Sequence, residues 1–197
     1  MVHGDPQGAV DLLLRLLDVW PTALGDGPDE VTLPRDAHLL LPAPLRPDTV
    51  RQWAYRWLTV APPLMADEDQ VLELRFTDPR LTGFLTEHHP TYDIAPGTPS
   101  IVRWAGIEDE DGNLIACGSH QRTEFTGFPQ LGSIATATAR RGSGLGAAVT
   151  AWLSRRAIDE AGVCTLVHPS GNISAARLFT RLGYETDDSY TTFRLHR

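Results

Sequence analysis

The stretch from residue 131 to residue 167 constrains the fold of this chain most. It begins with an extended run over 131–139 and continues through a glycine-rich turn into a long helical pattern that ends near Ala161. The continuous apolar run Val163–Val167 follows. Two strands joined by a helix form a parallel crossover, and such crossovers are right-handed in nearly all sheets. The sequence therefore predicts an α/β fold in which helices flank a central sheet of mixed direction.

The residues around this unit supply further elements of the predicted sheet. Two apolar runs, Ile101–Ile107 and Leu114–Gly118, flank Asp111-Gly112, which is typical of a hairpin turn. A helix over Ile173–Leu182 ends at Gly183, because glycine accepts the left-handed conformation after a last helical turn. The sequence also predicts a strand over Leu72–Phe76, a short helix over 79–88 and a last strand over Tyr190–Leu195.

Residues 1–90 have a less regular pattern, and a proline-rich linker over 89–99 separates them from residues 100–197. Asp5 and Pro6 predict the start of a first helix. Residues 25–47 read as a loop with a strand at Leu39–Leu41. A second helix is expected from about Asp48, because apolar residues recur at helical spacing, namely Val50, Trp53, Ala54, Trp57 and Leu58.

The composition excludes several classes of protein. The net charge of −8 disfavours binding to nucleic acid or to anionic membranes, and no apolar run approaches the ~20 residues that a membrane span needs. Cys117 and Cys164 lie in apolar runs, as buried cysteines do, and predict neither a disulfide framework nor a metal site. The N-terminal sequence does not resemble a signal peptide. We therefore expect a cytoplasmic protein without a metal.

The turn before the long helix has the composition of an anion-binding loop. The first amides of a helix have no partner within it and lie at the positive end of its dipole, and glycines let a phosphate approach them. Two arginines add attraction for phosphate oxygens. The loop residues are Arg140, Arg141, Gly142, Ser143, Gly144, Leu145 and Gly146. The same glycines also suit a plain strand-to-helix turn, and their spacing fits neither a Walker loop nor a dinucleotide fingerprint.

Two motifs together resemble a known family. Arg141-x-x-Gly144-x-Gly146 resembles the R/Q-x-x-G-x-G/A cofactor loop of GNAT acetyltransferases. The segment from Asn172 through Phe179 to Gly183-Tyr184 resembles the helix that follows in that family. The resemblance covers roughly residues 100–196 and implies a GNAT-like mixed sheet. The layout, with a divergent region over 1–90 before a core over 100–197, is similar to the glycine-N-acyltransferase-like branch.

The resemblance implies acetyl-CoA as the cofactor. The loop from Arg140 to Gly146 would bind its pyrophosphate, and Ile134, Ala135 and Thr136 would bind the pantetheine arm through their backbone. On the following helix, the implied cofactor contacts are Asn172, Ala176 and Phe179. Two alternatives stay open. Residues 134–136 could belong to an ordinary buried strand, and Asn172 could serve only as a helix cap.

The chain departs from the family at Phe179. Many relatives carry a tyrosine there, whose hydroxyl protonates the departing CoA thiolate, and phenylalanine cannot do this. Tyr184 and Tyr190 are substitute donors, or water serves. Because the CoA thiol is a fair leaving group, acyl transfer does not require this acid.

An ammonium acceptor also needs a base, because only the neutral amine attacks a carbonyl. His120, Glu124 and His168 lie at strand ends near the expected cleft, and we favour Glu124 and His120. Gln130 stands where some acyl-glycine-forming relatives place a glutamate. Each of these residues could also be a solvated residue at a strand end.

These features predict an N-acyltransferase that moves an acetyl group from acetyl-CoA to a primary amine of a small molecule or protein. Residues 1–90 would cover the acceptor side of the cleft. The partners expected are therefore acetyl-CoA and an amine acceptor, with no nucleic acid and no membrane, while a homodimer stays open. The alternative function is an acyl-CoA-binding module with a GNAT fold that has lost catalysis, which the phenylalanine at position 179 motivates.

Overall fold

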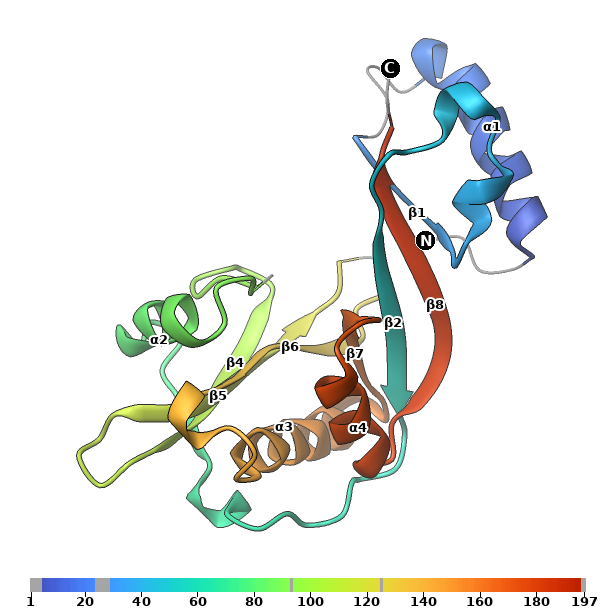
Figure 1. Ribbon diagram of the computed structural model, residues 1–197. Coiled ribbons are helices and arrows are strands. Elements are labelled where there is room, and N and C mark those ends of the chain that lie inside the picture. The colour runs from blue at the N-terminus through green and yellow to red at the C-terminus, as the bar shows by residue number, and fades with distance from the viewer. Residues whose placement is uncertain (1–4, 24–28, 93, 125, 196–197) are drawn as a thin grey trace. The chain divides into compact units, whose positions relative to one another are not determined.

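The computed structural model describes residues 5–23, 29–92, 94–124 and 126–195, shown in Figure 1. The chain divides into two compact units. Unit 1 comprises residues 1–55, 168–176 and 186–197, and unit 2 comprises residues 56–167 and 177–185. No helix in the described part of the chain is both long and apolar enough to cross a membrane.

Unit 2 contains a mixed sheet, as predicted. Its strands lie in the order β7-β6-β5-β4-β3. Their bounds are β3 Leu72–Leu74, β4 Ile101–Glu108, β5 Leu114–Arg122, β6 Pro129–Thr136 and β7 Cys164–Pro169, the last two residues of which belong to unit 1. The pairs from β3 to β6 are antiparallel, whereas β6 and β7 are parallel and are joined by a helix. The strand–helix–strand crossover expected from residue 131 onward is therefore confirmed.

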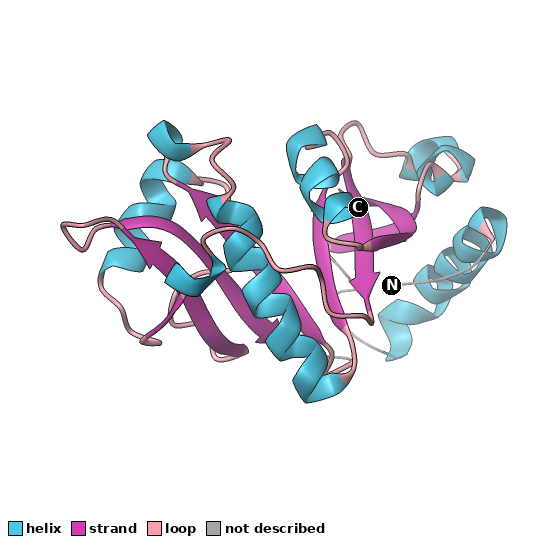
Figure 2. Ribbon diagram, turned by 90° about the horizontal axis from the view of Figure 1, so that it is seen from below, coloured by secondary structure: helices cyan, strands magenta, loops and turns pink. Residues whose placement is uncertain are grey.

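Two helices cover opposite faces of this sheet (Figures 1 and 2). Helix α3, Leu145–Ala161, packs on β4, β5 and β6, and helix α2, Arg80–His88, packs on β5 and β6 from the other side. Gly118 of β5 lets α3 approach closely, since a Cβ atom there would lie 3.1 Å from Val149 Cγ1 and 3.2 Å from Leu153 Cδ1. The glycine therefore fixes how deeply α3 sits on the sheet.

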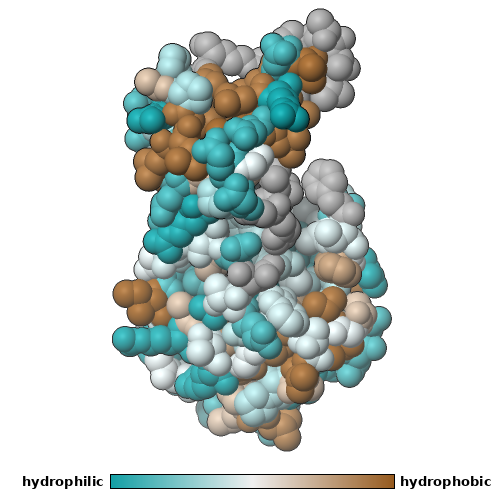
Figure 3. All heavy atoms as spheres, turned by 90° about the vertical axis from the view of Figure 1, so that its right-hand side faces the viewer, coloured by the Kyte–Doolittle hydropathy of each residue, from teal (hydrophilic) through white to brown (hydrophobic). Residues whose placement is uncertain are grey.

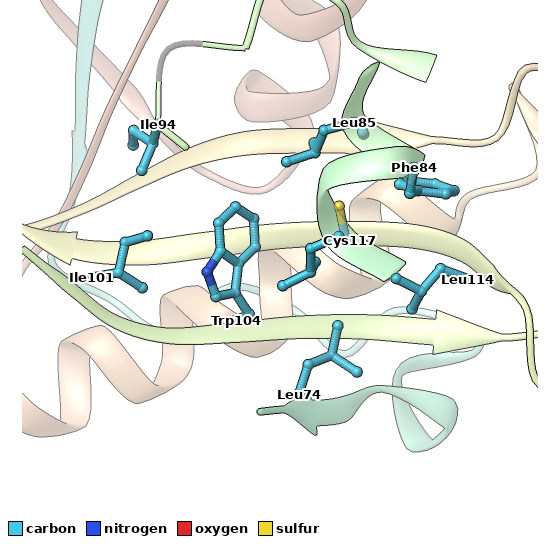
Figure 4. Packing of buried hydrophobic residues seen from close by; sticks show 10 residues of the cluster. Leu74, Phe84, Leu85, Ile94, Ile101, Trp104, Leu114 and Cys117 are labelled. Carbon is cyan, nitrogen blue, oxygen red and sulfur yellow. The ribbon is translucent and has the colours of Figure 1, made fainter. Parts of the chain in front are cut away.

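A hydrophobic cluster fills the space between α2 and the sheet (Figure 4). Trp104 of β4 and Cys117 of β5 are fully buried in it beneath Leu81 and Leu85 of α2. Ile94 also belongs to the cluster, although it lies in the stretch predicted to be a linker. Burial of this apolar area supplies most of the favourable free energy that holds α2 on the sheet.

Unit 1 contains α1 Pro6–Ala23, β1 Glu30–Pro34, most of β2 Arg51–Leu58 and nearly all of β8 Glu185–Arg194. Strand β1 pairs antiparallel with β8, which neighbours β2. A second cluster, which includes Val10, Leu33 and Leu41, joins α1 to these elements. Hydrophobic side chains also show on the surface of this unit (Figure 3), where Leu39 is 58% exposed.

Two predictions for the N-terminal part are wrong. The helix expected from Asp48 is the strand β2, in which burial alternates over Ala54, Arg56 and Leu58. Tryptophan and tyrosine favour strands, and their packing there outweighs the helical spacing. The strand expected at Leu39–Leu41 is instead a short 3₁₀ helix, Ala37–Leu40.

The other predicted elements are present with shifted ends. The strand expected at Leu72–Phe76 is β3, the short helix over 79–88 is α2, and the helix expected to end before Gly183 is α4, Ile173–Arg181. Gly183 has a φ of +90° and therefore the left-handed conformation that its position requires. β3 and α2, which belong to residues 1–90, lie in the same unit as the rest of the sheet. That residues 1–90 cover the acceptor side of the cleft stays a prediction.

Candidate active site

The loop between β6 and α3 has an open, exposed conformation. Gly142 and Gly144 have φ values of +85° and +98°, which side-chain-bearing residues rarely adopt. A Cβ atom on either glycine would have no other heavy atom within 4 Å. The glycines therefore give the loop its turn and leave space above its backbone for a ligand.

Amide groups in this loop are available to an anion. The N–H groups of Ala147 and Ala148 bind Gly144 O, at 2.8 and 3.1 Å. Among the described residues, no backbone partner is recorded for the N–H groups of Gly142, Leu145 and Gly146. These amides lie at the positive end of the α3 dipole, so the loop has the chemistry of a phosphate cradle.

The start of α3 lies directly against the end of β6. A Cβ atom placed at Gly146 would lie 3.1 Å from Thr136 Oγ1. This separation is tighter than an ordinary contact, so only a glycine fits without displacement of its neighbour. The predicted pantetheine residue Thr136 and the predicted phosphate residue Gly146 are thus brought together.

The two loop arginines have different surroundings. Arg141 Nη2 donates a hydrogen bond of 2.7 Å to the backbone carbonyl of His88, the last residue of α2. Arg140 is exposed, and no hydrogen bond or ion pair of its side chain is recorded in the described part of the chain. Ser143 Oγ donates to Arg140 O at 2.6 Å. Arg140 is therefore the freer of the two cations for binding a phosphate.

Strands β6 and β7 separate before their ends. Their recorded pairing comprises only Gln130 with Thr165 and Leu131 with Leu166. β6 nevertheless continues to Thr136, and its other neighbour, β5, lies on its opposite edge. Within the described residues, the edge of β6 beyond Leu131 therefore has no strand partner. This is the edge predicted to receive the amide-like pantetheine arm.

The predicted residues of α4 have local structural roles. Asn172 Oδ1 accepts a hydrogen bond of 3.0 Å from the backbone N–H of Ala175, so Asn172 caps the helix. Ala176 follows in the first turns, and its N–H binds Asn172 O at 3.0 Å. Phe179 is buried and packs edge-on against the Tyr184 ring, with centroids 5.9 Å apart. Cofactor contacts by these residues stay predictions.

The Tyr184 hydroxyl is hydrogen-bonded to two side chains of unit 2. Its hydroxyl lies 2.7 Å from Ser154 Oγ and 3.1 Å from Cys164 Sγ. Ser154 donates its own hydrogen to Thr150 O, so Tyr184 is the donor to Ser154. Burial raises the pKa of the Tyr184 phenol well above its ordinary value. The other substitute donor, Tyr190, is 2% exposed.

The two favoured bases differ in accessibility. His120 lies on β5 opposite Leu131, is fully buried, and has no hydrogen-bond partner for either ring nitrogen among the described residues. Burial lowers the pKa of His120 to about 4. Glu124 follows β5 in the exposed loop before β6. His120 is thus a neutral imidazole at neutral pH, and Glu124 is the carboxylate that solvent reaches.

The remaining polar candidates have protein partners. Gln130 Oε1 accepts a hydrogen bond of 3.2 Å from Gln121 Nε2. His168 Nδ1 lies 2.9 Å from Pro169 O, and the imidazole is 4% exposed. Within the described ranges, no group of three or more histidine, cysteine, aspartate or glutamate residues is arranged to hold a metal ion.

Ser133 was not among the predicted site residues. It lies in the middle of β6 with a φ of +48°, directly before the predicted pantetheine residues. The signal that could have found this position is Gly132, because an isolated glycine within a strand pattern indicates a bulge.

Comparisons with known proteins agree with this arrangement. The family model of the GNAT acetyltransferases matches residues 64–184, more than half of the chain. A GNAT-family protein from Novosphingobium aromaticivorans has a similar fold, with a TM-score of 0.66 at 22% identity over 87% of this chain and 76% of that chain. A GCN5-related N-acetyltransferase from Kribbella flavida has a TM-score of 0.61 at 19% identity over 100% of this chain and 78% of that chain.

A third structure, a GNAT-family acetyltransferase from Colwellia psychrerythraea, has a TM-score of 0.60 at 15% identity and covers 100% of this chain and 76% of that chain. No curated protein matches the sequence. The identities are low, so the structural likeness establishes the fold, while the family model establishes membership. The chain belongs to the GNAT acetyltransferase family.

Proposed function

We propose that this protein transfers an acetyl group from acetyl-CoA to a primary amine of a small molecule or protein. Membership of the GNAT family supports acyl transfer from CoA to an amine. The observation that carries the proposal is the pair of binding features side by side in unit 2. The free amides at the start of α3 suit a pyrophosphate, and the unpaired edge of β6 suits the arm that follows it.

The residues present fit the cofactor. Gly142 and Gly144 leave the amides uncovered, so the loop from Arg140 to Gly146 would hold the pyrophosphate with the help of the exposed Arg140. Ile134, Ala135 and Thr136 would bind the pantetheine arm as a strand-like partner. When bound, acetyl-CoA supplies an acyl group that its thioester makes electrophilic.

The acceptor must arrive at the thioester as a neutral amine. We propose Glu124 as the residue that removes the proton, because its carboxylate is exposed at the end of β5. His120 stays the second candidate. Its imidazole is neutral at pH 7 and could accept a proton, but complete burial makes the charged form unfavourable.

Protonation of the departing thiolate would use neither the residue at position 179 nor Tyr184. Phe179 has no acidic hydrogen, and the Tyr184 hydroxyl already donates to Ser154. We therefore propose that the thiolate leaves without a dedicated acid and takes its proton from water. The CoA thiol is acidic enough for this to be compatible with turnover.

Phe179 and Tyr184 also suggest a second function. A protein that binds acyl-CoA without transferring the acyl group would also have no need of a hydroxyl at position 179 or of a free phenol at position 184. The binding features of the loop and of β6 would be unchanged in such a module.

Turnover with a panel of primary amines distinguishes the two functions. The purified protein is mixed with acetyl-CoA and each amine, and release of CoA thiol is followed against a reaction without amine. The proposed function predicts amine-dependent release with at least one acceptor and loss of most of that release in Glu124→Gln. Tight binding of acetyl-CoA without release by any amine would instead favour the binding module.

A further inference from the structure

Strand β6 bends at Ser133. This residue has a left-handed backbone, with a φ of +48°, although it is not a glycine. The pairing with β5 shifts at the same place, between the pairs Cys117–Ala135 and Ser119–Gly132. Pairing with β7 has already ended at Leu131. The bend therefore coincides with the point at which β6 leaves its parallel neighbour.

A residue from a distant segment holds this bend. Ser133 Oγ donates a buried hydrogen bond of 2.8 Å to the backbone carbonyl of Ile94. The Ile94 side chain also rests on Gly132, because a Cβ atom at Gly132 would lie only 2.1 Å from Ile94 Cδ1. Figure 4 shows Ile94 at the edge of the cluster beneath α2, beside Trp104 and Ile101.

We propose that Ser133 and Ile94 form a clasp that keeps β6 bent and makes Ser133 a positioning residue for the thioester of acetyl-CoA. This inference rests on the proposed function. A left-handed backbone at a serine is strained and persists only where the surroundings hold it. The bond to Ile94 and the contact on Gly132 supply that restraint.

The clasp acts on one end of the cofactor. Ile134, Ala135 and Thr136 follow the bend directly, so release of the clasp would move the edge that faces the pantetheine arm. The phosphate loop has supports outside residues 134–136, since Arg141 donates a hydrogen bond to His88 O and the N–H groups of Ala147 and Ala148 bind Gly144 O. Loss of the clasp should therefore weaken contacts to the arm more than contacts to the nucleotide.

The first test compares Ser133→Ala with Ser154→Ala. Both serines are buried and donate to a backbone carbonyl, but Ser154 lies in α3. Calorimetry measures the Kd of each variant for acetyl-CoA and for adenosine 3′-phosphate 5′-diphosphate, the nucleotide end of CoA. Ser133→Ala should raise the Kd for acetyl-CoA about fivefold, as loss of one net hydrogen bond does, and change the Kd for the nucleotide less than twofold.

Equal weakening of both ligands in Ser133→Ala would overturn the clasp, because it would indicate general loosening. So would an unchanged Kd for acetyl-CoA. Ser154→Ala should leave both Kd values within twofold of the wild-type values.

The second test perturbs the contact between Ile94 and Gly132. Gly132→Ala places a methyl group against Ile94 Cδ1 and should also raise the Kd for acetyl-CoA severalfold. Ile94→Val removes Cδ1, so the double variant Gly132→Ala/Ile94→Val should recover binding to within twofold of Ile94→Val alone. Absence of recovery would show that Ile94 does not rest on Gly132 in the way that the clasp requires.

Hydrogen exchange separates failure of the clasp from failure of the proposed function. Ser133→Ala should speed amide exchange of residues 134–136 in the free protein at least fivefold over Ser154→Ala. A wild-type protein that binds neither ligand would refute the proposed function, and the exchange rates would still decide the clasp. Exchange that is equally slow in both variants would overturn it.

Discussion

Replacement of His120 by leucine should make the protein more stable and change how its stability depends on pH. The imidazole is fully buried, and neither ring nitrogen has a hydrogen-bond partner among the described residues. An unpartnered buried polar group costs about 1–3 kcal/mol. Leucine removes both nitrogens at similar volume, so His120→Leu should raise the free energy of unfolding at pH 7 by roughly 1–3 kcal/mol.

The pH dependence follows from the lowered pKa of His120. Burial moves this pKa from 6.5 to about 4, so between these values the unfolded chain binds a proton that the folded chain does not. Stability therefore falls as the pH decreases through this window. From pH 7 to pH 5, titration of His120 should lower the free energy of unfolding of the wild-type protein by about 2 kcal/mol. His120→Leu should not show this loss.

Urea unfolding of both proteins at pH 5, 6 and 7 measures this difference directly. Carboxylates titrate in both proteins, so their contribution cancels in the comparison. Equal losses between pH 7 and pH 5 would refute the reasoning and would mean that His120 is solvated or partnered in the folded state. Retention of amine-dependent turnover by His120→Leu would in addition exclude His120 as the base.

Three further expectations concern the ion pair on α3, the missing phenol and the extent of the folded unit. Glu68→Gln breaks the largely buried ion pair with Arg155 and should lower the free energy of unfolding by about 2 kcal/mol. The control Glu30→Gln breaks an exposed ion pair with Arg51 and should lower it by less than about 0.5 kcal/mol. Equal effects of the two variants in urea unfolding would contradict this ranking. Phe179→Tyr should raise kcat more than threefold if thiolate protonation limits the rate, and an unchanged kcat with chemistry rate-limiting would indicate another donor. A fragment over 101–197 should show no cooperative thermal transition, because it lacks Leu81, Leu85 and Ile94 of the cluster beneath α2. Cooperative melting of the fragment at the temperature of the full-length protein would show that residues 101–197 fold independently.

The parts of the fold that local chemistry determines were predictable from the sequence. Gly183 ends α4 and Asn172 caps it, because both effects depend only on residues within one or two turns. The turn around Gly142 and Gly144 was found in the same way, since few residues other than glycine accept its backbone. The crossover from β6 through α3 to β7 followed from the order of apolar runs.

The wrong and missing predictions involve partners that are distant in sequence. Trp53 and Trp57 fit a helical face, and only neighbouring strands decide that β2 is extended. The bend at Ser133 depends on Ile94, thirty-nine residues earlier, and nothing near Ser133 except Gly132 indicates it. The burial of His120 likewise depends on the elements that pack against β5, so its neutral state could not be inferred from its place at the end of a strand.

The most direct measurement of the central claim is calorimetric titration of acetyl-CoA into Gly144→Glu and into its matched control, Gly162→Glu. Both glycines have positive φ values and open space, and they cap the opposite ends of α3. A glutamate at position 144 would cover the free amides and repel the pyrophosphate, so Gly144→Glu should weaken binding at least a hundredfold while Gly162→Glu binds within threefold of wild type. Folded Gly144→Glu that binds acetyl-CoA as tightly as Gly162→Glu would contradict the account.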